Sequence, residues 1–324
     1  MEYDTKIQEQ IQQYSNNALR FFPPAVHKYW MQTYVTPKVL AVFGSHGIAN
    51  FYVDPLLGKY GPLEILSVGS GDGELELAIA QNLIAAGRND FRIHATELSP
   101  IRQQRTIERV AQAGLSDRFE FHILDLNKTF VDGQFDLIFA QHVLHHIVEL
   151  ELLFDNIATA MRPGGLFSTI DMIGRNGHMR WPEALEYIDQ VWAFIPDHWK
   201  YNFQLRAYHE KYLNWDCSKS GFEGIRAQDI QPLLLDRFAF DGIVASGGFM
   251  DVLFDRGYGQ SIDMTKPNEV ALVNFLSEMN EMLLETGRVK PTMVFAQMRR
   301  KDEVPETVRF FGNMTPEFAV RPVD

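Results

Sequence analysis

The fold is decided by the stretch Ile65-Leu66-Ser67-Val68-Gly69-Ser70-Gly71-Asp72-Gly73-Glu74-Leu75-Glu76-Leu77. An apolar run breaks into three alternating glycines and then resumes with helical spacing. Because glycine adopts positive φ and lacks a Cβ, a strand can turn sharply here while backbone N–H groups approach a ligand. A dinucleotide fingerprint needs a glycine at the sixth position from Gly69, where this chain has Glu74. The spacing therefore predicts a strand, a ligand-binding turn and a helix, and it argues against a nicotinamide dinucleotide.

Further strands are expected downstream, and two of them end in an acid. Phe91–Glu97 is predicted to be a second strand whose terminal carboxylate can accept both hydroxyls of a ribose. Phe119–Asp125 is expected to be the third strand and Phe135–Gln141 the fourth. The turn Arg162-Pro163-Gly164-Gly165 is expected to lead into a fifth strand, Leu166–Asp171. Strands that alternate with helices in this way predict a parallel sheet with right-handed crossovers.

These features together resemble the class I S-adenosylmethionine (SAM)-dependent methyltransferases, of the small-molecule O-methyltransferase type. Gly-x-Gly-x-Gly after an apolar strand matches motif I of that family, and residues 162–165 match its Leu-Arg-Pro-Gly-Gly turn except for Met161 in the first place. The resemblance covers residues 64–171. It implies an α/β fold with a Rossmann-like, mostly parallel, seven-stranded sheet and helices on both faces.

The resemblance also implies SAM as the cofactor and assigns its contacts. Glu97 would hold the ribose with Leu98 beside the adenine, and Asp125 would accept the adenine amine with Leu126 next to it. One departure is Ser67, which stands where the family often has an acid and brings no charge toward the methionine amine of the cofactor. The predicted cofactor-binding set is Gly69, Ser70, Gly71, Gly73, Glu97, Leu98, Asp125, Leu126 and Gln141.

Composition excludes several classes of function. The 324 residues include 30 Lys and Arg against 42 Asp and Glu, a net charge of −12, and such an acidic chain repels nucleic acid. Cys217 is the single cysteine, so no intrachain disulfide can form. The first residues lack a signal-peptide pattern, and no apolar run approaches the ~20 residues that cross a bilayer. We expect a cytoplasmic protein with a small-molecule substrate and no nucleic-acid or membrane partner. The sequence leaves the oligomeric state open, with a homodimer as one option.

The chain is expected to divide into five segments. These are an N-terminal helical cap (1–58), a SAM-binding Rossmann-like core (59–171), a substrate lid inserted after strand five (172–236), a segment that completes the sheet (237–300) and a C-terminal tail (301–324). Within the fourth segment, two strands are expected near 240–247 and 291–298, around a helix at 268–285 that carries an apolar stripe.

The lid segment is rich in aromatic side chains and holds four of the five tryptophans. Some of its residues recur at intervals of three and four, which predicts a helix face packed on the core: Trp181, Leu185, Ile188, Trp192 and Ile195. An insertion after strand five lies over the carboxyl ends of the strands, where ligands bind. The other aromatic residues therefore suit an apolar or ring-shaped substrate. Trp199 and Tyr208 are predicted to contact that substrate.

A histidine-rich stretch begins at the end of strand four: Gln141-His142-Val143-Leu144-His145-His146. Histidine is the side chain best suited to general-base work near neutral pH. Leu-His-His in this place also resembles small-molecule O-methyltransferases, some of which pair the histidine with an acid at the end of strand five. Asp171 has that position here. We therefore predict His145, His146 and Asp171 as catalytic residues and His142 as a substrate contact.

The sequence does not predict a metal site. His142 and His146 have the spacing of two ligands on one helical face, but a zinc peptidase needs a glutamate directly after the first histidine, where this chain has Val143. A divalent ion held by Asp171 or Asp216 stays an alternative that no spacing requires.

The predicted function is methyl transfer to a hydroxyl of a sugar-containing or aromatic small molecule. Such a reaction is an in-line displacement, so the enzyme mainly aligns the reacting groups. An aminopropyltransferase-like enzyme is one alternative, although it would want a more carboxylate-rich acceptor cleft than an aromatic lid offers. A SAM-binding regulatory subunit without activity is the other. His145, His146 and Asp171 argue against that second alternative.

Overall fold

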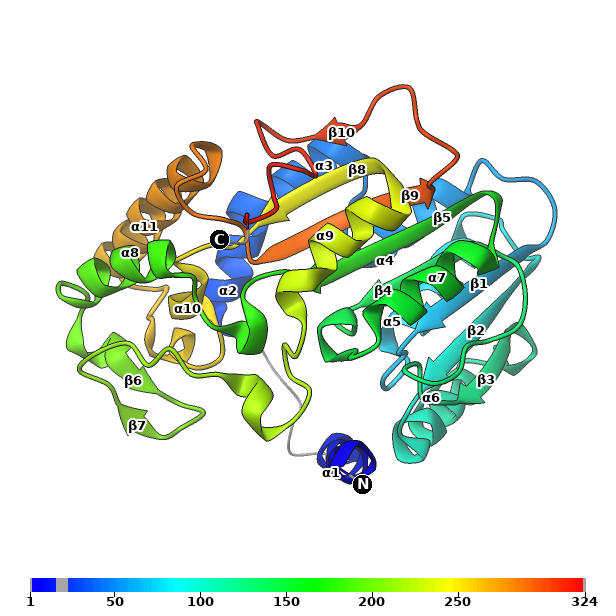
Figure 1. The fold of residues 1–324 in the computed structure, drawn as a ribbon, viewed down its shortest axis with the longest axis horizontal. Coiled ribbons are helices and arrows are strands. Elements are labelled where there is room, and N and C mark those ends of the chain that lie inside the picture. The colour runs from blue at the N-terminus through cyan, green and yellow to red at the C-terminus, as the bar shows by residue number, and fades with distance from the viewer. Residues whose placement is uncertain (1, 16–22, 323–324) are drawn as a thin grey trace.

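The computed structural model describes residues 2–15 and 23–322, and its centre is one twisted sheet (Figure 1). The strand order is β10-β8-β9-β5-β4-β1-β2-β3, and all neighbours pair in parallel except β9, which is antiparallel to β5 and β8. The strands are β1 (Leu63–Val68), β2 (Phe91–Glu97), β3 (Phe119–Ile123), β4 (Phe135–Gln141), β5 (Met161–Met172), β8 (Phe238–Ser246), β9 (Met293–Arg300) and β10 (Arg309–Phe310).

The predicted α/β class is confirmed, but the sheet has eight strands where seven were expected. The additional strand is β10, whose two residues in the C-terminal tail pair with Gly242 and Ile243 of β8 at the sheet edge. Strand β5 begins at Met161, so the predicted turn at 162–165 lies within the strand, where the pairing with β4 shifts register. A short edge strand and a bulged strand leave little periodic signal in a sequence.

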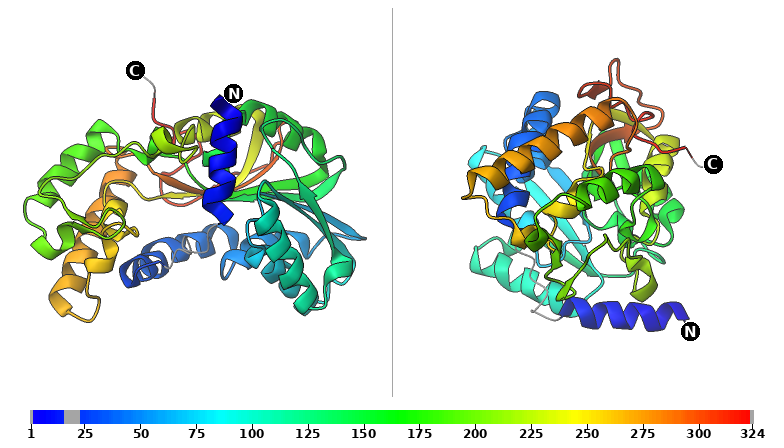
Figure 2. Two further views of the ribbon diagram at one scale, coloured as in Figure 1. Left: turned by 90° about the horizontal axis from the view of Figure 1, so that it is seen from below. Right: turned by 90° about the vertical axis from the view of Figure 1, so that its left-hand side faces the viewer.

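Helices cover both faces of the sheet because its strands are apolar on both sides (Figures 1 and 2). Ile65 of β1 and Phe139 of β4 belong to one core, and their neighbours Leu66 and Ile138 belong to the other. The first face packs against α3 (Thr36–Phe43), α4 (Ile48–Val53), α5 (Glu74–Ala85) and α6 (Pro100–Gln112), and the second against α7 (Leu150–Ala160) and α9 (Ala227–Arg237).

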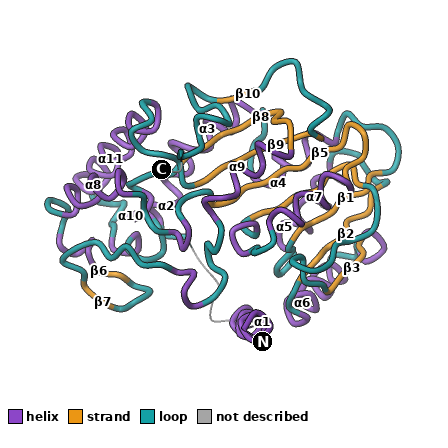
Figure 3. The backbone as a smooth tube through the Cα atoms, viewed as in Figure 1, coloured by secondary structure: helices purple, strands orange, loops and turns teal. Residues whose placement is uncertain are grey.

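A second group of elements lies beside the sheet, at the left of Figure 1. It contains α2 (Ala25–Trp30), α8 (Pro182–Trp192), α10 (Asp251–Phe254), α11 (Pro267–Glu285) and the short hairpin of β6 (Tyr201–Asn202) and β7 (Ala207–Tyr208). The helix expected at 268–285 is confirmed as α11. In α8, Ile188 and Trp192 are buried, as the helical spacing predicted. Long loops join α8 to α9 (Figure 3).

Helix α1 (Glu2–Ser15) lies at the bottom of Figure 1 and in front of the other elements in the left view of Figure 2. Ile7 and Gln10 on this helix are buried. Parts of the predicted N-terminal cap (residues 1 and 16–22) and of the predicted C-terminal tail (323–324) lie outside the described residues. The division of the chain into five segments stays a prediction. No helix in 2–15 or 23–322 is both long enough and apolar enough to cross a membrane.

Candidate active site

A cavity of about 360 Å³ opens at the carboxyl ends of β1, β2 and β4. The chain order reverses between β1 and β4, and ligands of open parallel sheets bind at such a switch point. The structure brings eight of the nine predicted cofactor residues to the cavity wall, namely Gly69, Ser70, Gly71, Glu97, Leu98, Asp125, Leu126 and Gln141. The ninth, Gly73, begins α5 as its N-cap with φ 73°.

The backbone of the glycine turn has a conformation and close contacts that only glycine tolerates. Gly69 and Gly71 have φ of 74° and 59°, which side chains with a Cβ rarely adopt. A Cβ on Gly71 would meet the guanidinium of Arg102, and one on Gly73 would clash with Thr106. The open backbone that results is the kind of cradle that a nucleotide-like ligand needs.

Glu97 is buried at the end of β2 and supports the glycine turn. Its Oε2 accepts a hydrogen bond from the Gly71 N–H at 2.9 Å, and its Oε1 accepts one from Ser99 N–H at 2.9 Å. Burial raises the pKa of Glu97 while the Arg102 charge opposes that rise. A carboxylate oxygen has two lone pairs and can accept more than one hydrogen bond, so Glu97 is suited to accept a ribose hydroxyl as well.

Asp125 is engaged by helix α1. The Tyr3 hydroxyl lies 3.1 and 2.9 Å from the two carboxylate oxygens of Asp125, and the Asn127 N–H donates to Oδ1 at 3.0 Å. Burial and then Asp125 itself raise the pKa of Tyr3, which keeps its hydroxyl a donor. Helix α1 therefore covers the carboxylate to which the adenine amine was assigned.

Three buried oxygens in the cavity wall have no hydrogen-bond partner: Ser70 Oγ, Glu76 Oε2 and Gln141 Oε1. An unpaired buried polar group costs about 1–3 kcal/mol, so such groups usually have a partner. Their convergence on one cavity fits a ligand that carries several polar groups. SAM is such a ligand.

Glu76 is a site residue that the sequence analysis missed. Its Oε1 accepts a hydrogen bond from the Ser67 hydroxyl at 2.6 Å, and burial raises its pKa to about 7. Helix α5 thus brings a carboxylate to Ser67, the position where the resembled family often has an acid on the strand. The available signal was its place on the first turn of the helix, three residues after Gly73.

Asp171 organises the histidine-rich turn next to the cavity. Its Oδ1 lies 2.5 Å from Nδ1 of His145, and its Oδ2 accepts hydrogen bonds from the Val143 and Leu144 N–H groups at 2.9 and 2.8 Å. Residues 144–146 form a 3₁₀ turn, and His142 has φ 51°. Their spacing suggested that His142 and His146 share one helical face. They do not, because His142 lies outside this short turn.

The two adjacent histidines differ in basicity. Burial by itself lowers the pKa of His145, but the Asp171 charge and hydrogen bond outweigh it and raise that pKa above its ordinary 6.5. Burial raises the pKa of Asp171, yet His145 brings it down to about 2. Burial and the neighbouring charge of His145 lower the pKa of His146 to about 3. His145 is therefore the stronger base and His146 is neutral.

Two lid residues converge on these histidines. Nε2 of His178 lies 2.9 Å from Oε1 of Glu223, and Nε2 of His145 and of His146 each lie 3.7 Å from that carboxylate. Burial raises the pKa of Glu223, but the histidines around it lower that pKa well below its usual range. His142 and His146 line the cavity, so the polar group adjoins the cofactor region directly.

Trp199 and Tyr208 are not brought to the cavity. Trp199 is fully buried, and its indole N–H donates to Glu269 on α11 at 2.9 Å. Tyr208 is 49% exposed on the hairpin, and its hydroxyl donates to Asp197 at 3.3 Å. Trp199 does not reach the cavity because it packs the lid against α11.

The comparison with protein families agrees with this geometry. Residues 66–167 match a family model described as a methyltransferase domain. This match identifies residues 66–167 as a methyltransferase domain. The match covers the second half of β1, all of β2, β3 and β4, and the first part of β5. It therefore includes the carboxyl ends of β1, β2 and β4, where the cavity opens.

Curated proteins also match about a third of the chain. Highly reducing polyketide synthase easB of Emericella nidulans is 31% identical over 123 residues, which are 36% of this chain and 5% of the synthase. The 27-O-demethylrifamycin SV methyltransferase of Amycolatopsis mediterranei is 26% identical over 110 residues, 34% of this chain and 38% of that enzyme. The chain thus spans a small part of the length of these relatives.

One solved structure similar to this chain is the O-methyltransferase from a trans-AT PKS multienzyme of Brevibacillus brevis, in complex with S-adenosyl-L-homocysteine. The two share 16% sequence identity with a TM-score of 0.44, over 77% of this chain and 71% of that one.

Proposed function

We propose that this protein transfers the methyl group of SAM to a hydroxyl of a small molecule. The observation that carries the proposal is the hydrogen-bonded pair of Asp171 and His145. The His145 ring lies next to the ring of His146, which lines the cavity, at a centroid distance of 4.2 Å. A base oriented in this way, next to the cofactor region of a methyltransferase domain, is what deprotonation of a hydroxyl acceptor requires.

Different residues of the cavity wall bind different parts of the cofactor. The glycine turn approaches the cofactor through its backbone, Glu97 accepts the ribose hydroxyls, and Asp125 accepts the adenine amine. Glu76 and Ser67 take the methionine ammonium, because Glu76 Oε2 is a buried carboxylate oxygen of the cavity wall without a hydrogen-bond partner. SAM supplies an activated methyl group when bound.

The acceptor proton passes to Nε2 of His145. Because Nδ1 of His145 is hydrogen-bonded to the Asp171 carboxylate, the proton of the neutral imidazole stays on Nδ1. Nε2 then has the lone pair that can accept a proton. His178 and Glu223 lie on the lid side of this nitrogen and provide hydrogen-bonding groups for a polyhydroxylated acceptor. A sugar-containing or aromatic hydroxyl compound fits this lining, and the relative named for rifamycin methylation acts on a small molecule.

Calorimetry with SAM and S-adenosylhomocysteine, followed by transfer of labelled methyl from SAM to a panel of hydroxylated metabolites, tests the proposal. We expect binding of both ligands and label in an ether product. Glu97→Ala should weaken binding by about 1–3 kcal/mol. Transfer of an aminopropyl group from decarboxylated SAM would show the aminopropyltransferase alternative instead. Tight binding without transfer to any acceptor in an extract would point to the regulatory alternative.

A further inference from the structure

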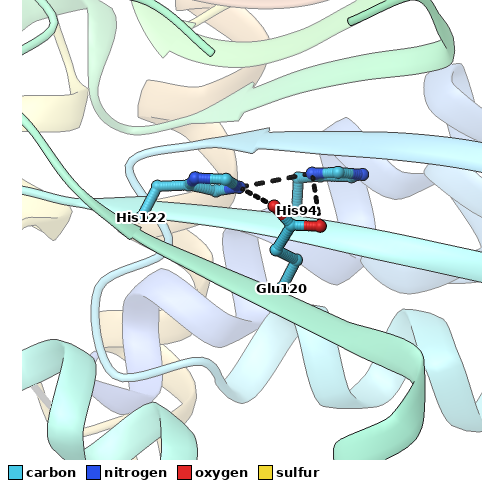
Figure 4. A group of neighbouring side chains, drawn as sticks. All are labelled: His94, Glu120 and His122. Carbon is cyan, nitrogen blue, oxygen red and sulfur yellow. Dashed lines mark hydrogen bonds and ion pairs between the residues drawn. The ribbon is translucent and has the colours of Figure 1, made fainter. Parts of the chain in front are cut away.

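A second group of metal-ligating side chains lies on the sheet, apart from the cavity (Figure 4). His94 is on β2, and Glu120 and His122 are on β3. His94 pairs in register with Glu120, and His122 follows two residues later on the same strand. Because alternate residues of a strand and paired residues of neighbouring strands share a face, all three side chains stand on one face of the sheet.

The ligand atoms have separations that suit a tetrahedral ion. Nδ1 of His94 and Nε2 of His122 are 3.2 Å apart, and the Glu120 carboxylate lies 3.8 Å from the first nitrogen and 3.5 Å from the second. Zinc–nitrogen bonds of about 2.0–2.1 Å in tetrahedral geometry place the ligand atoms roughly 3.3 Å apart. The two nitrogens are thus separated by about the distance expected between two ligands of one tetrahedral ion, and the carboxylate lies a few tenths of an ångström further away.

Glu64 on β1 adds the support that metal-binding histidines usually have. Its Oε2 lies 3.0 Å from Nε2 of His94, which fixes the proton on that nitrogen and leaves the Nδ1 lone pair directed at His122. The His94 ring also packs edge-to-face against Phe135 at a centroid distance of 5.2 Å. A carboxylate on the far nitrogen and a packed ring hold one ligand ready before any ion binds.

We propose that His94, Glu120 and His122 form a binding site for a Zn²⁺ ion. Two imidazoles and one carboxylate are donors that Zn²⁺ accepts, and the 46% exposed Glu120 side chain leaves the fourth position open to water. The ion links β2 to β3 near the strand ends that lead to Glu97 and Asp125. The site stabilises the sheet edge that carries part of the cofactor cavity, and it takes no part in methyl transfer.

The group of His145, His178 and Glu223 is the other arrangement of this kind among residues 2–15 and 23–322. It belongs to the candidate active site already described, where His178 is hydrogen-bonded to Glu223 just as His94 is to His122 in the proposed site. A test of the proposed zinc site must therefore distinguish the two groups, and one variant in each does so.

The experiment is a titration of tag-free, chelator-treated full-length protein with Co²⁺, read by the visible absorption of the tetrahedral ion, followed by displacement with Zn²⁺. We expect one ion per chain in the wild type and in His178→Ala. The signal should disappear in His122→Ala, and the affinity should fall about 10–100-fold in Glu64→Gln, which leaves all three ligands in place. Zn²⁺ should raise the Tm of the wild type but not that of Glu120→Ala.

Circular dichroism shows whether each variant is folded, and the half-exposed Glu120 provides a loss-of-ligand variant that does not rely on His122. No tetrahedral Co²⁺ signal in the wild type would overturn the proposal. So would loss of the signal in His178→Ala together with its retention in His122→Ala, because the ion would then belong to the active-site group.

Discussion

The Ser67 hydroxyl donates a 2.6 Å hydrogen bond to Oε1 of Glu76 and so joins the carboxyl end of β1 to the first turn of α5. The second carboxylate oxygen of Glu76 is buried in the cavity wall without a partner. Burial raises the pKa of Glu76 to about 7, so near neutral pH the site holds a carboxyl group that readily gains or loses its proton. A cationic ligand group would favour the ionised form.

We predict that Glu76→Gln weakens SAM binding about 10-fold or more, since a hydrogen bond to a charged group contributes about 1.5–3 kcal/mol. Wild-type affinity should rise as pH increases through 7, and the affinity of the variant should not. Calorimetry at several pH values measures both. Glu108→Gln, which changes an exposed residue of α6, is the matched control. Equal affinity of the wild type and Glu76→Gln at pH 8 would remove Glu76 from the ammonium site.

The same substitution should not lower stability at alkaline pH. A carboxyl with an ordinary pKa of 4.5 in the unfolded chain and about 7 in the folded protein favours folding only while it is protonated. The free-energy cost of burying the ionised Glu76 carboxylate therefore grows from pH 4.5 to about pH 7 and is fully present above pH 7. Glu76→Gln removes that cost, so its Tm at pH 8 should equal or exceed that of the wild type. A lower Tm would show that the carboxylate has a stabilising partner in the free protein.

His145→Ala should lower kcat by about 10²–10⁴ with SAM affinity preserved, because it removes the general base. In the wild type, kcat should fall as pH decreases, with a midpoint above 6.5, since Asp171 raises the pKa of His145. Asp171→Asn should move that midpoint to lower pH, a shift that a purely structural role would not give. His146→Ala should cost less, because its neutral ring has a pKa of about 3. Equal rates for the wild type and His145→Ala would exclude it as the base.

Tyr3→Phe should tighten SAM binding about 3–10-fold. The Tyr3 hydroxyl bonds both oxygens of Asp125, so the adenine amine must compete with it, and one such hydrogen bond contributes about 0.5–1.5 kcal/mol. Calorimetry of the variant beside Tyr60→Phe, a change at a fully exposed tyrosine, measures the effect. Weaker binding in Tyr3→Phe would mean that the hydroxyl contacts the cofactor.

Trp199→Ala and Tyr208→Ala separate packing from recognition in the lid. Trp199 is fully buried, so its truncation should cost about 3–5 kcal/mol of unfolding free energy. Tyr208 is on the surface, and its truncation should change stability by less than about 0.5 kcal/mol. Denaturant unfolding checks both values. Once an acceptor is found, a raised acceptor KM in Tyr208→Ala at unchanged stability would place the hairpin in substrate binding.

Much of the core follows from local sequence. The bounds of β2 and β4 coincide with their predicted ranges, and α11 differs from its prediction by one residue, because apolar periodicity and turn chemistry act over a few residues. Eight of the nine predicted cofactor residues reach the cavity for a related reason, since the carboxyl ends of neighbouring parallel strands meet at one edge of a sheet. The two-residue strand β10 has no comparable signal, because its partner is nearly 70 residues away in the chain.

By itself, the sequence determined the glycine turn, the acid at the end of β2 and the α/β class, since each depends on backbone conformation and spacing within a short segment. The predicted third strand was two residues too long, because β3 ends at Ile123 and Asp125 begins the turn that follows. Tertiary structure decided which groups meet. It placed Glu76 beside Ser67, Tyr3 on Asp125, and Glu223 beside His145, contacts that join different elements and that no local pattern specifies. It also buried Trp199, because side-chain burial depends on the element that packs against it, here α11.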